Sequence, residues 1–275
     1  MCNDYGVSEN EESLAGGWAT MVTRVGNTVF RSPKPQSRTV IPFLSYLESV
    51  GFPAAPKPIG TGFAPDGREM FEFIEGTSPH PFAWSDEAAF EIGALLRQLH
   101  TLSAQWKMPL DAQWQTSFLR GLPGTTSVIG HGDLGPWNIL ARDARPCAFI
   151  DWDNAGPLDP LWELAHVTWQ NAQLYDDDVS DANNLPDATG RSRQSKLILD
   201  GYGLGRDLRR DLVDRMIQLA IWSAREEAVD HKVTADTLSP SPEGYPILWA
   251  VTWRARSAAW MLDHRELLQR TIDGG

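Results

Sequence analysis

Apolar and polar positions alternate with the two-residue period of β-strands in the first part of the chain. Residues 18–25, WATMVTRV, are rich in β-branched side chains, and a Gly26-Asn27 turn separates them from a second strand-like run, TVFR. A further pair of runs, 59–63 and 69–76, flanks the turn sequence PDGR. The pattern therefore predicts two β-hairpins within the first 75 residues.

One helix is predicted between these hairpins. Apolar residues recur at helical spacing from residue 41 to residue 47. Pro42 is tolerated only in the first turn of a helix, so this helix is expected to begin at about Arg38 or Thr39.

Helical periodicity dominates after residue 76. Ser85, followed by two acidic residues, is a typical helix start, and residues 92–99 continue with an apolar stripe. Further helices are predicted at about 158–174, 206–230 and 245–270. The polar stretch 175–196 is predicted to be a mobile loop or a lid over a substrate.

This change of period predicts an α+β chain with two lobes. Residues 1–13 are expected to form a flexible N-terminal tail, residues 14–75 a small β-rich N-lobe, and residues 76–275 a larger α-helical C-lobe. The opening residues contain no basic segment followed by an apolar one, and no apolar run reaches membrane-spanning length. We therefore expect no membrane partner.

Charge and cysteine content narrow the function classes. The formal net charge of −12 argues against a nucleic-acid partner, because binding to the phosphate backbone needs a positive face. The same charge could attract a cationic small molecule. Cys2 and Cys147 are the two cysteines of the sequence, so no disulfide framework is implied and a cytoplasmic location is expected.

The candidate chemistry lies in the stretch 128–153, VIGHGDLGPWNILARDARPCAFIDWD. Asn138 and Asp151 lie at the two ends of a predicted hairpin and would meet at its mouth, with Asp133 in the preceding loop. Two carboxylates in such proximity repel each other, and Mg²⁺ relieves this conflict while keeping positions for water and phosphate oxygens. The arrangement indicates phosphoryl transfer. Each residue taken singly could instead be a turn or a cap.

The same residues carry a resemblance to a known family. HGDLGPWN, which contains Asp133 and Asn138, and the later FIDWD, which contains Asp151, resemble the catalytic signature of the aminoglycoside phosphotransferase and choline kinase family. That family has the protein-kinase-like two-lobe fold. GPLDPLWELA resembles the family's segment after the metal aspartate, with Glu163 where aspartate is commoner.

The resemblance implies a role for each residue of the motif. Asp133 would be the catalytic base that positions the acceptor hydroxyl, and Asn138 and Asp151 would hold Mg²⁺. His131 would support the loop by packing and hydrogen bonding. Asp153 would either contact a second metal ion through water or cap a turn.

The resemblance also implies the substrates. The γ-phosphoryl group of ATP or GTP would pass to the hydroxyl of a small molecule, and a cationic aminoglycoside-type antibiotic is one candidate. The backbone of Glu72, Phe73 and Ile74 would form the hinge that holds the adenine.

The nucleotide lobe departs from the family pattern. Arg31 stands where the family has the lysine that binds the α/β-phosphates, and Lys34 is a nearby substitute. Val40 falls where a helix glutamate is expected, so the ion pair with that cation is predicted to be absent. The glycine-rich loop is reduced to Gly16 and Gly17.

Two functions of different class are consistent with these residues. Intact Asp133, Asn138 and Asp151 favour an active small-molecule kinase. The altered nucleotide lobe favours a kinase-like binding protein that has lost turnover and acts as a resistance or immunity factor. Between residues 163 and 190 the chain carries six carboxylates and no lysine or arginine, which would suit a polycationic acceptor if this segment faces the cleft.

Overall fold

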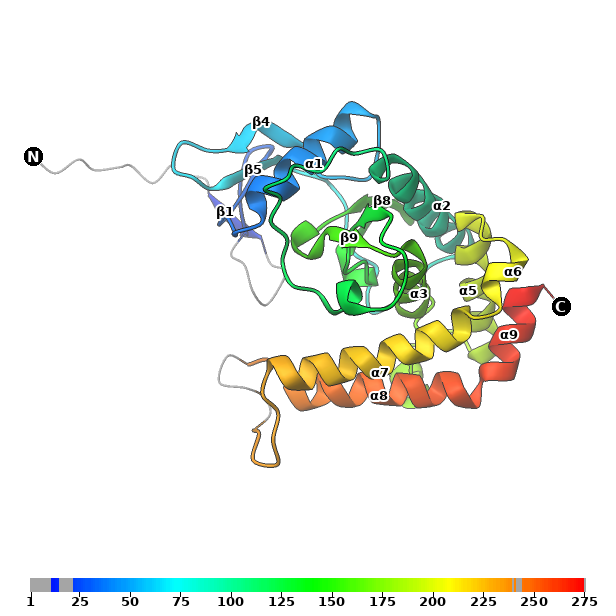
Figure 1. The fold of residues 1–275 in the computed structure, drawn as a ribbon. Coiled ribbons are helices and arrows are strands. Elements are labelled where there is room, and N and C mark those ends of the chain that lie inside the picture. The colour runs from blue at the N-terminus through cyan, green and yellow to red at the C-terminus, as the bar shows by residue number, and fades with distance from the viewer. Residues whose placement is uncertain (1–10, 15–21, 239, 241–243, 275) are drawn as a thin grey trace, which may run out of the picture.

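The computed structural model describes residues 11–14, 22–238, 240 and 244–274. Its N-lobe is one antiparallel sheet with a single helix against it (Figure 1). The strands, in sheet order, are β1 (Glu12–Leu14), β2 (Val22–Val25), β3 (Thr28–Arg31), β5 (Glu69–Glu72) and β4 (Pro58–Phe63). The helix is α1 (Ser37–Ser49).

Both predicted hairpins are present in this sheet. β2 and β3 pair across the Gly26-Asn27 turn, with Val25 opposite Thr28, and β4 pairs with β5 across the PDGR turn. Glu12 and Ser13, at the end of the predicted tail, pair with β2, whereas residues 1–10 lie outside the described residues.

The position of Pro42 in α1 corrects one expectation. The helix begins at Ser37, so Pro42 lies in its second turn rather than its first. Proline cannot donate the backbone hydrogen bond of that position. Because Pro42 lies on the exposed side of α1, the ring faces away from the core and the helix continues.

The C-lobe is helical around two small β-ladders. Its helices are α2 (Asp86–Ser103), α3 (Pro160–Asn171), α4 (Asp177–Ala182), α5 (Ala188–Tyr202), α6 (Arg206–Arg209), α7 (Leu212–Asp230), α8 (Ile247–Asp263) and α9 (Arg265–Asp273). The ladders pair β6 (Val128–Gly130) with β9 (Gly156–Leu158) and β7 (Ile139–Arg142) with β8 (Arg145–Phe149). Short 3₁₀ helices are η1 (Phe118–Gly121), η2 (Pro136–Asn138) and η3 (Trp152–Asn154). In Figure 1, α7 and α8 run alongside each other as a long antiparallel pair.

The prediction of a mobile loop or lid at residues 175–196 is wrong. The segment forms α4 and the first half of α5. Its polar side chains hold the two helices: Asp187 accepts a hydrogen bond from the N–H of Gly190 at 2.7 Å. The buried guanidinium of Arg191 donates to the carbonyl of Tyr175 and to the hydroxyl of Ser180, both at 2.6 Å. A polar sequence is therefore used for helix caps and internal hydrogen bonds here.

Helices α2 and α5 of the C-lobe pack closely against each other. A Cβ atom added at Gly93 of α2 would overlap the carbonyl oxygen of Ile198, and one added at Gly201 of α5 would overlap that of Phe90. The two helix backbones approach each other closely only because both positions are glycine. Among the helices of the described residues, none is both long enough and apolar enough to cross a membrane.

We predict that Gly93→Ala lowers the free energy of unfolding by about 2 kcal/mol, since overpacking forces the two backbones apart. Gly205→Ala is the matched control, because nothing lies within 4 Å of a Cβ added there. Urea unfolding monitored by circular dichroism measures both variants. Equal stability of the two would contradict the close approach of α2 and α5.

Candidate functional site

The loop between β6 and β7 carries the predicted catalytic motif. The Nδ2 atom of Asn138 donates to the backbone carbonyl of Asp133 at 2.8 Å and to its Oδ2 atom at 3.2 Å. The N–H of Ile150 donates to the carbonyl of Asn138 at 2.9 Å. Since Ile150 directly precedes Asp151, the hairpin brings all three predicted residues to its mouth.

Asp151 has an unusual backbone. Its φ of 61° and ψ of 67° lie in the left-handed region, which residues other than glycine seldom adopt. A strained backbone conformation persists only where the surrounding structure holds it, and such residues cluster at functional sites. This conformation turns the chain from β8 into η3 and leaves 52% of the Asp151 side chain exposed.

The electrostatics of the site favour a base at Asp133. Burial of its carboxylate, together with the charge of Asp151, raises the pKa of Asp133 to about 7. The charge of Arg254 and the hydrogen bond from Asn138 act in the opposite direction. A carboxylate with a pKa near neutrality is suited to accept a proton under physiological conditions.

His131 supports the loop from inside. The ring is buried, and its Nε2 atom lies 2.8 Å from the carbonyl oxygen of Ile150. The N–H of Asp133 donates to its Nδ1 atom at 3.3 Å. These partners assign the proton to Nε2. The ring also packs on Trp152 at a centroid distance of 4.7 Å. His131 is therefore buried, and both ring nitrogens are bonded to the backbone of the site.

Glu163 of α3 anchors the same loop. It is buried and accepts the backbone N–H of Gly132 at 2.7 Å and Nε2 of His100 at 2.7 Å. His100 in turn contacts the hydroxyl of Tyr202 at 2.8 Å through Nδ1. Burial alone would raise the pKa of Glu163, but the hydrogen bonds from His100 and Gly132 lower it overall.

The roles of His100 and Tyr202 were not predicted from the sequence. His100 lies on α2, 63 residues before Glu163. Tyr202 lies on α5, 102 residues after His100. A histidine at the end of the apolar stripe of α2 was the available signal, since a buried histidine needs a hydrogen-bond partner.

The ion pair of Arg31 is made with a residue other than the helix glutamate that the resemblance implies. The Nε atom of Arg31 is paired with the buried carboxylate of Glu69. The carboxylate comes from strand β5 rather than from helix α1, where Val40 stands. Arg31 and Glu69 are direct cross-strand partners in the register of β3 and β5, and opposite charges in such positions attract. The pair joins strands of two different hairpins, so no short spacing in the sequence indicates it.

Asp153 connects Arg31 with a second cation. The Nη2 atom of Arg31 lies 2.6 Å from Oδ1 of Asp153, and Lys34 is bonded to Oδ2. Burial would raise the pKa of Asp153, but the charges of Arg31 and Lys34 hold it below its usual range. Nη1 of Arg31 also lies 3.8 Å from Oδ1 of Asp151. The two candidate phosphate-binding cations therefore border the predicted metal site.

The predicted hinge begins at the end of β5. The N–H of Glu72 donates to the carbonyl of Lys57 at 2.9 Å, and that of Phe73 donates to Asn27 at 2.8 Å. These two donors serve the N-lobe and are not free for a nucleotide. Ile74 is the remaining residue of the predicted hinge. The reduced glycine-rich loop, which is predicted at Gly16 and Gly17, lies outside the described residues.

The carboxylates of residues 163–190 are largely engaged within the C-lobe. Glu163 is buried under the catalytic loop, Asp176 and Asp178 pair with Arg256, and Asp177 pairs with Arg191 at 2.9 Å. These four carboxylates therefore have partners within the C-lobe, but two arginines neutralise only part of their charge.

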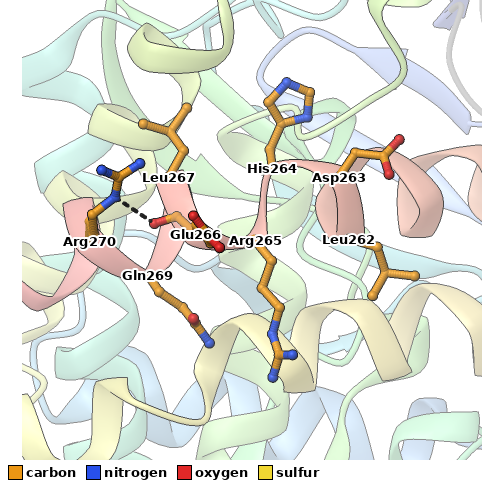
Figure 2. Close-up of a pocket in the computed structure, with 8 residues that line it drawn as sticks. All are labelled: Leu262, Asp263, His264, Arg265, Glu266, Leu267, Gln269 and Arg270. Carbon is orange, nitrogen blue, oxygen red and sulfur yellow. Dashed lines mark hydrogen bonds between the residues drawn. The ribbon is translucent and has the colours of Figure 1, made fainter.

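A hollow of about 570 Å³ at the corner between α8 and α9 is separate from this site. Figure 2 shows that its side chains, all from residues 262–270, point in different directions from one short segment. None belongs to the catalytic loop or to the N-lobe. The convergent set of polar groups remains the one around Asp133.

Two sequence comparisons relate this chain to known proteins. Residues 103–193, which include the catalytic loop, match the model of the phosphotransferase enzyme family. A trifolitoxin immunity protein from Rhizobium leguminosarum bv. trifolii is 45% identical over 263 residues, covering 96% of this chain and 99% of that protein.

Solved structures show the same fold. Amicoumacin kinase hAmiN, in complex with AMP-PNP, Ca²⁺ and Ami, has a TM-score of 0.67 at 12% identity, over 93% of this chain and 89% of that one. A microcompartment-associated aminopropanol kinase has a TM-score of 0.64 at 15% identity, over 97% and 96%. Choline kinase from Cryptosporidium parvum Iowa II has a TM-score of 0.61 at 12% identity, over 98% and 93%.

The fold is thus the protein-kinase-like two-lobe fold that the sequence predicts. The chain belongs to the phosphotransferase enzyme family, and it shares most of its length with an immunity protein.

We predict that Glu163→Gln lowers the free energy of unfolding by about 2 kcal/mol, because the amide cannot accept both buried hydrogen bonds in the same way. The loss should be largest at neutral pH and shrink in acid. The pKa of Glu163 is lowered in the folded protein, so its contribution is present above the unfolded pKa and is lost as pH falls. Glu226→Gln, at a half-buried position of α7 where the carboxylate pairs with its exposed neighbour Arg225, is the control. Thermal melts at several pH values measure both, and a pH-independent loss would contradict the ionised state of Glu163.

Proposed function

We propose that this protein is a small-molecule kinase that transfers the γ-phosphoryl group of ATP or GTP to a hydroxyl group. The observation that carries the proposal is the hydrogen-bonded pair of Asp133 and Asn138 beside the half-exposed carboxylate of Asp151. This is the donor set that phosphoryl transfer needs: one group for the hydroxyl and two oxygen ligands for a metal.

The residues present fit Mg²⁺. Asn138 and Asp151 offer the amide and carboxylate oxygens that Mg²⁺ prefers. Burial and the neighbouring charge of Asp153 raise the pKa of Asp151, so an added cation would favour its ionised form. Bound there, Mg²⁺ would supply charge neutralisation at the β- and γ-phosphates.

Asp133 would act on the acceptor. It would accept the proton of the hydroxyl as the hydroxyl oxygen bonds to the γ-phosphorus, while the bond from phosphorus to the bridging oxygen breaks and the nucleoside diphosphate leaves. His131 and Glu163 would hold the loop so that the carboxylate stays aligned. Arg31 and Lys34 would bind the phosphates, with Glu69 and Asp153 fixing their positions.

We further propose that the acceptor is a toxic compound to which the cell must be immune. The relative with 45% identity is an immunity protein, and amicoumacin kinase is among the proteins of similar fold. Adding a phosphate group changes the charge and shape of a small molecule, which disrupts recognition by its target. A kinase can thus confer immunity catalytically.

A second candidate function is binding without turnover. The observation that favours it is the neutralisation of Arg31 and Lys34 by Glu69 and Asp153. A nucleotide would have to compete with these carboxylates for the cations. The protein would then confer immunity by sequestering the toxin, and Asp133 would have no proton to accept.

We predict that Mg·ATP or Mg·GTP raises the melting temperature of the wild-type protein. A ligand at a hundred times its Kd stabilises a fold by about 2.7 kcal/mol. Asp133→Ala should keep this shift and lose phosphoryl transfer, because its role is confined to the acceptor, whereas Asp151→Ala should lose the shift as well. Mg²⁺ alone is the control. No shift with either nucleotide would support the binding function, and equal loss in both variants would contradict the division of roles.

We predict that transfer activity falls on the acid side of about pH 7. The raised pKa of Asp133 means that its carboxyl is protonated below this value and cannot accept the hydroxyl proton. The rate should fall about tenfold for each pH unit below the pKa, as expected for one essential base. A kcat/KM profile between pH 5 and 9, which reports the pKa of the free enzyme, measures this once a substrate is found by screening hydroxylated antibiotics and toxins. A flat profile down to pH 5 would exclude Asp133 as a base with this pKa.

A further inference from the structure

The catalytic loop presents two side chains at the protein surface, those of Asp133 and Trp137. Six of the eight residues of HGDLGPWN are buried, Asp133 is half-buried, and Trp137 is 37% exposed. Tryptophan offers a large, rigid apolar face, and such faces are enriched where proteins bind other molecules. The exposed indole, carried by the same short loop as the proposed base, is therefore available to a substrate.

The indole of Trp137 rests on the backbone of the loop itself. A Cβ atom added at Gly135 would lie 2.5 to 2.8 Å from three atoms of the six-membered ring. Gly135 has a φ of −79° and a ψ of 167°, which is an extended backbone open to any residue. Glycine is therefore needed at this position for space, because the indole occupies the place of a side chain there.

The segment that follows the predicted hinge also holds the indole. The ring of His80 lies edge-on to Trp137, at a centroid distance of 5.6 Å and an interplanar angle of 80°, which is a favoured geometry for aromatic pairs. The hydroxyl of Ser78 donates to the carbonyl of Pro136 at 2.8 Å, so this segment is bonded to the loop beside Trp137. The orientation of the indole is thus fixed while part of the ring stays accessible.

Asn138 connects the base with the indole. It directly follows Trp137, and its Nδ2 atom donates to Oδ2 of Asp133 at 3.2 Å. The carboxylate is therefore bonded to the residue next to Trp137, and the indole rests on Gly135, two residues after Asp133. One small molecule can contact both side chains at once.

The charges of these two segments decide which chemistry suits the indole. Neither the loop, residues 131–138, nor the segment 76–84 contains a lysine or an arginine. Burial lowers the pKa of His80, which favours its uncharged ring, so an anionic acceptor finds no partner beside Trp137. A cation gains little over an exposed ring, whereas a stacked planar ring gains both the aromatic contact and the buried apolar area. A planar, uncharged ring is therefore the best match.

We propose that Trp137 determines the specificity for the acceptor, because its indole stacks on a planar ring of the acceptor while the hydroxyl of that acceptor reaches Asp133. The acceptor class is then an alcohol whose hydroxyl is joined to an aromatic ring by a short chain. This role rests on the proposed kinase function and names its acceptor class. Gly135 and His80 position the indole for the contact.

The test uses three probes: 2-phenylethanol with a planar ring, 2-cyclohexylethanol with a puckered ring on the same chain, and choline with a cation and no ring. Their Kd values are measured from the line widths of the probe protons in NMR titrations. We expect 2-phenylethanol to bind about tenfold more tightly than the other two, the size of one stacking contact. Trp137→Ala should remove this preference, and Trp137→Phe should keep most of it. Gly135→Ala should also weaken binding, because its Cβ displaces the indole. Trp249→Ala, at a 46% exposed tryptophan of α8, is the control and should bind like the wild type.

Mn·ATP in place of Mg·ATP reports the direction of the bound probe. It should broaden the signal of the CH₂ group next to the hydroxyl in the wild-type protein, because that end lies toward the metal site. Equal Kd values for the three probes, tighter binding of choline, or an unchanged Kd in Trp137→Ala would overturn the role. So would a loss of the melting shift with Mg·ATP in Trp137→Ala, which would place the indole in the nucleotide site. The probe titrations need no turnover, so a wild-type protein that shows the ring preference but no melting shift with any nucleotide would overturn the kinase function and the acceptor role, and leave only a ring-binding site.

Discussion

The carboxylate of Glu163 holds the catalytic loop on helix α3, and the rest of the candidate site depends on this contact. It accepts the N–H of Gly132 through one oxygen and the ring of His100 through the other. The loop must come very close to make this bond. A Cβ at Gly130 would overlap the Glu163 carboxylate, and Gly132, at a φ of 79°, lies against the carbonyl of Asn154. Glycine is required at both positions for the loop to approach its neighbours this closely.

A second constraint is charge balance between the lobes. Arg31 meets three carboxylates, those of Glu69, Asp153 and Asp151. The guanidinium has five donors in one plane, so it can face a partner on its own sheet and others from the C-lobe at once. A lysine ammonium is a compact point charge at the end of a flexible stem. Arginine at residue 31 therefore suits an acidic partner on strand β5 together with the carboxylates of the C-lobe.

The sequence predicts well the features that are local along the chain. The hairpins and the Asp133–Asn138–Asp151 arrangement are set by short spacings, because a turn of a few residues fixes which side chains meet. Partners from distant elements, such as Glu69, His100 and Tyr202, cannot be recognised in this way, because no short spacing along the chain connects them with the residues they contact. The polar stretch that forms α4 and the first half of α5 is predicted to be a loop, because a polar sequence without an apolar period is typical of solvent-exposed segments. Asp187 and Arg191 instead satisfy helix ends and buried carbonyls, which composition does not reveal.

The energetic cost of Asp133 bears on the choice between enzyme and binder. Burial beside Asp151 raises the pKa of Asp133 far above that of a solvated aspartate, so its ionised form is destabilised in the folded protein. A protein that only binds a toxin gains nothing from this arrangement, and an asparagine at residue 133 would remove the repulsion. The chain retains the costly carboxylate, with the backbone groups on either side of it tied to α3 and with Arg254 opposing its repulsion. Such pKa perturbation at a convergent polar site is typical of residues that move protons.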